Sequence, residues 1–305
     1  MSTDVFQHDR PPHETSSIIR RRPLRWPNGA RVAFAVVVSA EYYEMAPAAE
    51  NFIPANVPGG FGRAPYPDFR AFSQRDYGNR VGVFRVIEAL HRFAMPATAA
   101  VDANVAARYP FVVREFQRHN IEIAGHGHAV TNVISSHMSE AGERAYIASA
   151  LDTLARVAGG RPLGWHGPEY GQSERTPALL AEFGIEYVLD WPNDEQPFLM
   201  RAPARPLVSL AMALELDDVI TIWHRRVGAE RWRRGVAEAL DQLLSDGAAS
   251  GRHLILNVHP WLIGHPHRIG YFEDVLADVR KRDRVWLANA SQIAAYARAQ
   301  LDRSQ

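Results

Sequence analysis

Four apolar runs in this sequence each lead into a residue with an imidazole or carboxylate side chain. The runs cover residues 31–39, 121–124, 185–189 and 254–258. The residues that follow them are, in order, Glu41, His126 with His128, Asp190 and His259. Largely apolar runs of this length are typical of buried parallel strands. Because catalytic groups in α/β folds gather at the carboxyl ends of such strands, the pattern predicts an enzyme with a histidine and carboxylate site.

Segments with helical periodicity separate these runs. Helices are predicted at residues 79–93, 110–119, 139–158, 176–183, 229–246, 269–282 and 291–302. Further strands are predicted at residues 97–101, 207–216 and 284–288. Ser139 and Thr176 are the expected N-caps of their helices, and Gly159 is expected to end the first of them. Strand and helix signals alternate about seven times, which predicts a single α/β domain of the β/α-barrel type.

Two segments fall outside this alternation. Residues 1–28 are polar and rich in Pro and Arg, which predicts an N-terminal arm that wraps the domain or a neighbouring subunit. Residues 29–305 then form the barrel domain. Residues 46–78 are rich in Pro, Gly and aromatic residues, and loops this long are usually functional or interface-forming. Together with the neutral charge, these segments predict a homo-oligomer.

The composition restricts the function classes. The formal net charge is zero, so no electrostatic bias favours nucleic acid or an anionic membrane as a partner. The absence of cysteine excludes disulfides, thiolate metal sites and thiol nucleophiles. No apolar run has membrane-spanning length, and the N-terminus lacks the apolar region of a secretory signal. We therefore expect a cytoplasmic protein that acts on a small-molecule substrate.

The histidines are the first candidates for chemistry. His126 and His128 flank Gly127 directly after a strand, which fits either a catalytic or metal-binding role or two structural loop histidines. His259 follows the run 254–258 and precedes Pro260, and its ordinary pKa near neutrality suits proton transfer. The alternative for His259 is a buried ring held by a backbone carbonyl.

The carboxylates have a similar choice of roles. Glu41 is the only acid directly after the first strand, where it could activate water, hold a substrate N–H or cap a helix. Asp190 could orient a histidine beside a pocket wall formed by Trp191, or it could belong to a Pro-containing turn. The segment 166–171 is a pocket loop or a plain turn. For Glu215, Asp217 and Asp218 we expect a solvated strand end rather than a site.

Taken in order, these segments resemble the polysaccharide deacetylase superfamily. More narrowly, they are similar to its allantoinase-like and cyclic-imide-hydrolase-like branch. The resemblance covers roughly residues 25–300 and is most specific at residues 26–32, 76–82, 125–127, 190–191 and 259–268. It implies a NodB-type distorted (β/α)7 barrel and a hydrolase acting on carbon–nitrogen bonds other than peptide bonds. It also implies that His259 is the general acid.

The sequence departs from the metal-dependent members of that superfamily. Those members carry an aspartate pair at the end of the first strand, where this chain has Val37 and Ser39, or Ser39 and Ala40, with Glu41 as the nearest acid. Their second histidine, four residues after the first, is replaced by Val130. The third-motif arginine is replaced by the segment 166–168. We therefore expect no bound metal. The alternative is Zn²⁺ or another divalent ion held by Glu41, His126 and His128 in an altered geometry.

The leading hypothesis is a hydrolase that opens a small cyclic amide, imide or ureide without a metal. Glu41 or His126 would activate water, Asp190 would orient an imidazole, and His259 would protonate the departing nitrogen. The expected substrate-binding residues are Tyr42, His128, His166, Trp191 and Trp261. One alternative is a metal-dependent N-deacetylase of a sugar or other N-acyl substrate. Another is a catalytically inactive barrel that binds a small ligand.

Overall fold

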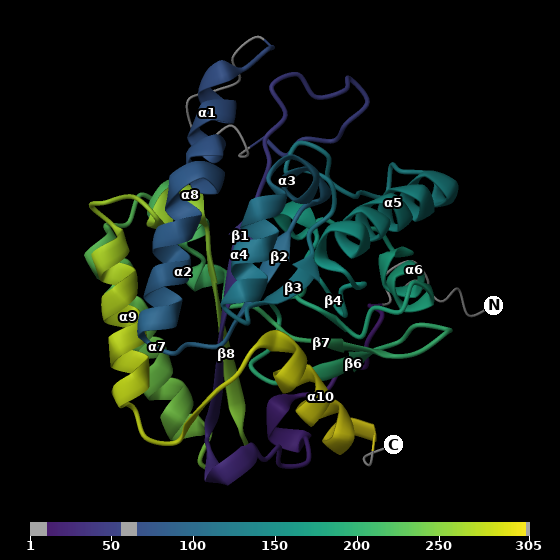
Figure 1. Cartoon of the computed structure of the whole chain (residues 1–305). Coiled ribbons are helices and arrows are strands. Elements are labelled where there is room, and N and C mark those ends of the chain that lie inside the picture. The colour runs from purple at the N-terminus through teal and green to yellow at the C-terminus, as the bar shows by residue number, and fades with distance from the viewer. Residues whose placement is uncertain (1–10, 56–65, 303–305) are drawn as a thin grey trace, which may run out of the picture.

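A long buried strand, β1 (Val32–Ala40), forms the centre of the fold. The computed structural model describes residues 11–55 and 66–302, and within them nine strands form one sheet (Figure 1). The other strands are β2 (Ala97–Val101), β3 (Glu122–Gly125), β4 (Gly164–Trp165), β5 (Tyr187–Val188), β6 (Phe198–Met200), β7 (Leu207–Ser209), β8 (Arg252–Val258) and β9 (Val285–Leu287). The strand order is β6-β7-β5-β4-β3-β2-β1-β8, and β9 also pairs with β1.

The parallel part of this sheet curls toward a barrel. The strands from β7 to β8 in that order are parallel to their neighbours, and only β6 pairs in the antiparallel direction. Met212, in the segment after β7, makes a parallel bridge to Ile255 of β8. One edge of β1 is divided, because residues 36–40 pair with β2 and residues 32–34 pair with β9. The predicted single-domain α/β fold, a distorted β/α barrel, is confirmed.

Helices surround the sheet. They are α1 (Phe69–Tyr77), α2 (Val83–Arg92), α3 (Ala103–Arg108), α4 (Pro110–Arg118), α5 (Glu140–Ala158), α6 (Thr176–Glu182), α7 (Ala229–Asp246), α8 (Pro260–Ile263), α9 (Ile269–Lys281) and α10 (Ala290–Leu301). The π-helical turn η3 (Gly78–Gly82) joins α1 to α2, and a second, η6 (Val219–His224), precedes α7. Figure 1 shows α2, α7 and α9 grouped beside β8. No helix in the described part of the chain is long and apolar enough to cross a bilayer.

The two faces of β1 pack into different parts of the core. Phe34 and the other residues on the same face of β1 pack with the helices outside the sheet, including Leu90 of α2 and Phe272 of α9. Ala35 and its alternate neighbours pack inside the curve of the sheet with Ile293 of α10. Burial of both faces explains why this strand is apolar throughout its sequence.

Most predicted elements are present, with three informative differences. The helix predicted at 79–93 begins at Phe69 and runs through the π-helical turn η3. The strand predicted at 207–216 ends at Ser209, and a 3-10 turn, η5 (Leu214–Leu216), follows it. The N-cap role predicted for Thr176 is wrong, because Arg175 is the capping residue and the Thr176 hydroxyl donates to Glu143.

The other predicted helix ends are confirmed. Ser139 accepts a hydrogen bond from the Gly142 N–H, as an N-cap should. Gly159 ends α5 in the left-handed conformation, with φ of 78°.

The described part of the N-terminal arm packs onto the domain that follows it. His13 makes an antiparallel bridge to Met200 at the end of β6. Arg21 forms an ion pair with Asp194 at 2.7 Å, and the Trp26 indole N–H donates to the Arg252 carbonyl at 2.6 Å. Residues 1–10 of the predicted arm and residues 56–65 of the predicted 46–78 loop lie outside the described residues.

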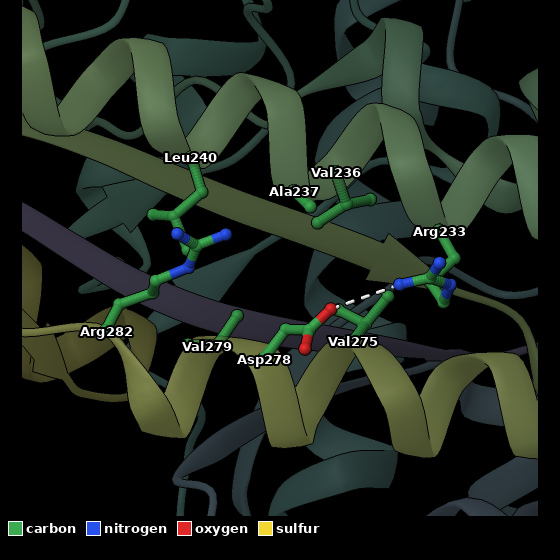
Figure 2. Close-up of a pocket in the computed structure, with 8 residues that line it drawn as sticks. All are labelled: Arg233, Val236, Ala237, Leu240, Val275, Asp278, Val279 and Arg282. Carbon is green, nitrogen blue, oxygen red and sulfur yellow. Dashed lines mark hydrogen bonds and ion pairs between the residues drawn. The ribbon is translucent and has the colours of Figure 1, made fainter.

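The groove between α7 and α9 is a packed helix contact. Figure 2 shows Leu240 of α7 and Val279 of α9 among the side chains that line it. The space between them does not admit a water molecule. Arg233 of α7 also forms an ion pair with Asp278 of α9 at 3.1 Å. This groove therefore contributes to stability and offers no ligand site.

Candidate active site

The ends of β1, β3 and β8 bring three predicted site residues together. Oε1 of Glu41 lies 3.4 Å from Nε2 of His259 and 3.8 Å from Nε2 of His126. All three residues are buried, with exposed fractions of 7% for Glu41, 6% for His259 and 1% for His126. The sheet explains this meeting, because β1 lies directly beside β8 and one strand away from β3. A carboxylate between two imidazole nitrogens is suited to proton transfer.

Trp261 holds the other oxygen of the Glu41 carboxylate. Its indole N–H donates to Oε2 of Glu41 at 3.0 Å. Trp261 belongs to the short helix α8, which begins directly after His259. Trp261, predicted to bind substrate, is therefore also a hydrogen-bond donor to the carboxylate.

The π-helical turn η3 sets the position of α8. A Cβ added at Gly82 would lie 2.0 Å from the Pro260 carbonyl oxygen, and one at Gly78 would lie 2.8 Å from the Trp261 nitrogen. Only glycine permits this approach of the two backbones. Asn79 of the same turn donates to the Glu41 carbonyl at 2.8 Å. Such π-helical turns occur frequently at functional sites, and here one fixes both Glu41 and Trp261.

Asp218 orients His259. Oδ1 of Asp218 lies 2.6 Å from Nδ1 of His259, and Oδ2 accepts the His259 backbone N–H at 3.0 Å. Because an ionised carboxylate only accepts hydrogen bonds, His259 carries a proton on Nδ1 in this contact. Its Nε2 atom is then directed at Glu41. The arrangement resembles the carboxylate–imidazole pair that orients a general acid or base in many hydrolases.

The solvated strand end predicted at Asp217 and Asp218 is wrong. Their exposed fractions are 2% and 0%, because the chain turns inward after the 3-10 turn η5. Asp217 caps the start of η6 by accepting the Val219 N–H at 2.8 Å. Its other oxygen accepts from Asn257 at 2.8 Å and from the Tyr170 hydroxyl at 3.1 Å. Asp217 therefore ties β8 and the 166–171 loop to this inward turn.

The electrostatics favour a charged pair at the centre of the site. Burial alone would lower the pKa of His259, but the negative charges of Glu41, Asp217 and Asp218 raise it well above its ordinary value. Burial alone would raise the pKa of Glu41, but the charge of His259 and the nearby imidazoles of His126 and His259 hold it well below its ordinary value. Burial raises the pKa of Asp218 to about 6, against the charge of His259. At neutral pH, Glu41 is therefore the anion and His259 the cation.

His126 presents an unused nitrogen to Glu41. Its Nδ1 donates to the His166 carbonyl at 2.7 Å, since a carbonyl can only accept. Its buried Nε2 atom has no hydrogen-bond partner among the described residues. Buried polar atoms without a partner are rare and require an explanation. The side facing Glu41 is therefore where a water molecule or a polar substrate atom would satisfy this nitrogen.

Asp190 orients His166, which lies behind His126. Nδ1 of His166 lies 2.9 Å from Oδ1 of Asp190, and the Gly167 N–H donates to the same oxygen at 2.7 Å. The ring of His166 stacks on that of His126 with centroids 4.6 Å apart. Burial lowers the pKa of His166, although Asp190 opposes this effect. Asp190 therefore acts on the site through His166, one layer behind the Glu41 carboxylate.

Three predicted substrate-binding residues lie elsewhere. The Tyr42 ring packs in the core against Phe72 and Tyr109. The His128 ring contacts Ser149 of α5 at 2.9 Å. The Trp191 indole donates to Gln172 at 2.9 Å. No contact in the described residues brings Tyr42, His128 or Trp191 to the Glu41 carboxylate, so substrate binding by these three residues stays a prediction.

The metal ligands proposed from the sequence do not come together in the structure. His128 points to α5, so the alternative set of Glu41, His126 and His128 does not converge. Within the described chain, the one group with three potential ligand atoms within 4.8 Å of one another is Asp217, Asp218 and His259. The Nδ1 atom of His259 is engaged by Asp218, and the oxygens of Asp217 accept hydrogen bonds from backbone and side chains. A metal ligand must present a free lone pair, so binding here would break these hydrogen bonds.

Sequence reasoning gave too little weight to Asp218 and missed Arg75. Asp218 follows an apolar run, as Glu41, Asp190 and His259 do, so the same rule pointed to it. Arg75 lies in a segment predicted as loop, and no local pattern marks it. It is 4% exposed, and its guanidinium lies 4.0 Å from the centroid of the Trp261 ring. This cation–π contact helps to fix the ring that holds Glu41.

Comparisons with known proteins agree with this architecture. Residues 72–188 match the family model described as "Polysaccharide deacetylase". A Schizosaccharomyces pombe protein named "Putative polysaccharide deacetylase" is 20% identical over 293 residues, which cover 88% of this chain and 91% of that protein.

Solved structures show the same fold over nearly the whole chain. A "putative polysaccharide deacetylase" from Mycobacterium smegmatis has a TM-score of 0.76 at 27% identity and covers 92% of this chain and 94% of its own. Puue allantoinase has a TM-score of 0.82 at 23% identity, with coverage of 92% and 94%. The resemblance predicted from the sequence is therefore confirmed: residues 72–188 match the polysaccharide deacetylase model, and nearly the whole chain is similar in fold to a putative polysaccharide deacetylase and to an allantoinase.

Proposed function

We propose that the protein is a hydrolase of non-peptide C–N bonds that opens a small cyclic amide, imide or ureide without a metal. The observation that carries this proposal is the Glu41 carboxylate between Nε2 of His126 and Nε2 of His259, with His259 held by Asp218. The similarity to polysaccharide deacetylases supports hydrolysis of a C–N bond. The structural similarity to an allantoinase supports a cyclic substrate.

The first step is attack of water on the substrate carbonyl. Oε1 of the Glu41 carboxylate takes a proton from the water as its oxygen bonds to the carbonyl carbon. The unpartnered Nε2 of His126 supplies a second hydrogen-bonding position for that water. Trp261 keeps the carboxylate oriented through Oε2. The result is a tetrahedral intermediate with the negative charge on the former carbonyl oxygen.

The second step breaks the C–N bond. The His259 imidazolium gives its Nε2 proton to the departing nitrogen, while Asp218 holds the ring from Nδ1. The new carboxylic acid group releases its proton to solvent. Glu41 then returns its proton to His259 across 3.4 Å, which restores the starting charges. In a ring, the departing nitrogen stays attached to the product.

Burial favours a small uncharged substrate over a polymer. Glu41 and His259 are only 7% and 6% exposed, and the Trp261 indole lies against both. A buried site that already contains paired charges penalises a further unpaired charge. Cyclic amides, imides and ureides are compact and neutral, and they present the carbonyl and N–H groups that such a site can bind.

The decisive test combines metal analysis with turnover. Protein purified without chelator is analysed for bound metal and assayed on allantoin, hydantoin and succinimide, with and without EDTA. We expect ring opening of at least one compound that is unchanged by EDTA, and its loss in His259→Ala with the fold intact. Stoichiometric zinc together with EDTA-sensitive deacetylation of an N-acetyl sugar would instead support the deacetylase alternative. Tight binding of the rings without turnover would support the inactive barrel.

We also propose that the protein forms a homo-oligomer. The 46–78 segment has exposed aromatic side chains among its described residues. Phe52 is 47% exposed and Phe69 is 67% exposed. Exposed aromatic side chains of this kind are enriched at protein–protein interfaces. Light scattering tests the proposal, and a monomeric mass at working concentration would contradict it.

A further inference from the structure

A pocket of about 160 Å³ lies at the end of the barrel opposite the candidate active site. Arg31 and Gly251 line this pocket, and they precede the parallel strands β1 and β8. Glu41 and His259 follow the same two strands. Since β1 has nine residues at about 3.3 Å each, roughly 30 Å separate the pocket from the active site. Figure 1 shows the purple N-terminal segment at this end of β1 and β8.

Three segments of the chain meet around the pocket. They are residues 24–31, the connection from α7 to β8, and the turn between α9 and β9. Backbone hydrogen bonds join these segments to one another. The Gly251 N–H donates to the Leu24 carbonyl at 2.8 Å, and the Arg31 N–H donates to the Arg284 carbonyl at 2.7 Å. The walls of the pocket are therefore held in place by the ends of the sheet.

The pocket carries positive charge only. Arg25, Arg31 and Arg284 line it, one near the start of each wall, and none of the described residues that line it is acidic. Asp246 and Asp283 are chain neighbours of lining residues, but neither lines the pocket itself. Three guanidinium groups around a hollow without a carboxylate produce a positive potential, which attracts anions.

Two of the three arginines are fixed by backbone carbonyls. Arg25 donates to the Ala249 carbonyl at 2.7 Å, and Arg31 donates to the Leu244 carbonyl at 3.3 Å. Each of these bonds uses one of the five N–H groups of a guanidinium, so both side chains keep further donors. A carbonyl is also uncharged, so neither bond neutralises the arginine. These contacts therefore orient two positive charges and leave them available to an anion.

Arg284 has no structural partner. Its side chain is exposed and makes no hydrogen bond or ion pair with any described residue. Its backbone has φ of 61°, in the left-handed region that residues other than glycine, asparagine and aspartate occupy only occasionally. The turn itself therefore gives no reason for an arginine at this position, whereas an anionic ligand in the pocket would.

We propose that this pocket is an anion site that binds a phosphate group through the guanidinium groups of Arg25, Arg31 and Arg284. The planar fork of an arginine matches two phosphate oxygens at once. The volume is sufficient, because a cavity needs only about 10–15 Å³ to hold a water molecule and phosphate has five heavy atoms. Since Arg25 and Arg284 are exposed, the pocket is open to solvent. The phosphate can therefore be the free ion or the end group of a small phosphomonoester.

Titration of the intact protein with inorganic phosphate tests the proposal. Calorimetry gives the Kd and thermal unfolding gives Tm, each compared with sodium chloride at the same ionic strength. We expect phosphate to bind and Tm to rise with its concentration, because a ligand that binds only the folded state stabilises it. If phosphate and chloride have the same effect, the inference is overturned. Glycerol 3-phosphate separates the two sources, since tighter binding than that of inorganic phosphate identifies a phosphomonoester and weaker binding identifies the free ion.

Arg284→Gln tests whether the arginine without a partner binds the anion. Loss of a hydrogen bond to a charged group should raise the Kd for phosphate by about 10- to 100-fold. Arg226→Gln is the matched control. Arg226 is also exposed, has no partner among the described residues and has φ of 56°, but it does not line the pocket. It should bind phosphate as the wild type does. Equal Kd values for the two variants would overturn the inference.

A second pair of variants places the anion in this pocket. Ala248 lines the pocket and is exposed, so the fold should tolerate a larger side chain there. Ala248→Glu adds a negative charge beside the arginines and should abolish phosphate binding, whereas Ala248→Gln has the same size and should retain it. Equally tight binding by both variants would mean that phosphate binds elsewhere, against the inference. None of these measurements uses turnover, so their outcome is independent of the proposed function.

Discussion

Asp218 binds His259 through both of its carboxylate oxygens. One oxygen lies 2.6 Å from Nδ1 of the ring, and the other accepts the backbone N–H of the same residue at 3.0 Å. The ring can therefore neither flip nor tilt without losing a hydrogen bond to a buried charge. The Nε2 atom that faces Glu41 thus has a fixed direction, which a proton donor requires.

Asp218→Asn should lower activity by weakening His259 as an acid. The amide keeps the size of the side chain but removes its charge, so the pKa of His259 falls. Because the imidazolium is the active form, the rate is lost as pH rises through the pKa of His259. The alkaline decline should then begin at a lower pH, with kcat at pH 8 reduced by about 100-fold, the lower range of general acid catalysis.

The pH profile of ring opening measures this effect. Glu215→Gln is the control, because Glu215 lies on the same inward turn but is exposed and pairs with Arg225. It should leave the profile unchanged. A profile of Asp218→Asn that coincides with the wild type would show that Asp218 has no part in the proton transfer.

Gly82→Ala should destabilise the protein and disturb the site together. The new Cβ would lie 2.0 Å from the Pro260 carbonyl oxygen, so η3 and α8 must separate. Overpacking of this kind costs about 1–3 kcal/mol of unfolding free energy, and the displaced Trp261 would weaken its bond to Glu41. Urea unfolding and kcat measure the two effects.

Gly235→Ala is the matched control for that substitution. Gly235 lies inside α7, and a Cβ there would meet only Leu216, at an ordinary contact distance of 3.5 Å. Alanine in a helix interior should stabilise by about 0.5–1 kcal/mol. If Gly82→Ala is as stable as Gly235→Ala, the close approach of η3 to Pro260 is not required.

Trp261→Phe should change the basicity of Glu41. Phenylalanine keeps an aromatic ring but removes the N–H that donates to Oε2 at 3.0 Å. Loss of a hydrogen bond to the charged form raises the pKa of Glu41. Since the carboxylate is the active form, the acid limb of the pH–rate profile should move to higher pH. An acid limb that does not move would mean that Glu41 is not the base.

The sequence contained enough to predict the barrel and the centre of the site. The strands β1 and β8 are buried on both faces, so their sequences are apolar and easily recognised, and each ends next to a site residue, Glu41 or His259. The parallel order of the sheet then brings the strand ends together. The spacing of apolar residues and the position of site residues directly after parallel strands can both be recognised in short stretches of sequence. Both signals are present at β1 and β8.

The parts that could not be predicted depend on contacts between distant segments. Asp217 and Asp218 were expected at a solvated strand end, and only the turn after η5 brings Asp218 to His259. Arg75 contacts Trp261 because η3 packs closely against α8. Gly78 and Gly82 permit this close approach, but the presence of two glycines in the sequence does not predict it. His128 follows the same strand as His126, yet a bond to Ser149 turns it toward α5.

A buried histidine outside the site makes stability depend on pH. His253 of β8 is 3% exposed, and its Nε2 donates to the Ala211 carbonyl at 2.9 Å. Its Nδ1 has no hydrogen-bond partner in the described part of the chain. Burial lowers the pKa of His253 from 6.5 to about 4, although the bond to Ala211 opposes this effect. The folded protein therefore resists protonation of this ring.

We expect His253→Gln to reduce the loss of stability in acid. Between pH 6.5 and about 4 the unfolded chain binds a proton at this histidine and the folded chain does not, so stability falls as pH decreases through this range. The difference between these two pKa values of His253 corresponds to about 3 kcal/mol of unfolding free energy. Glutamine can still donate to Ala211 but cannot titrate. The difference in unfolding free energy between the two proteins should therefore shift in favour of the variant by about this amount from pH 7 to pH 4, as measured by urea unfolding. Since the other titrating groups are common to both proteins, parallel curves would show that His253 is protonated in the folded state.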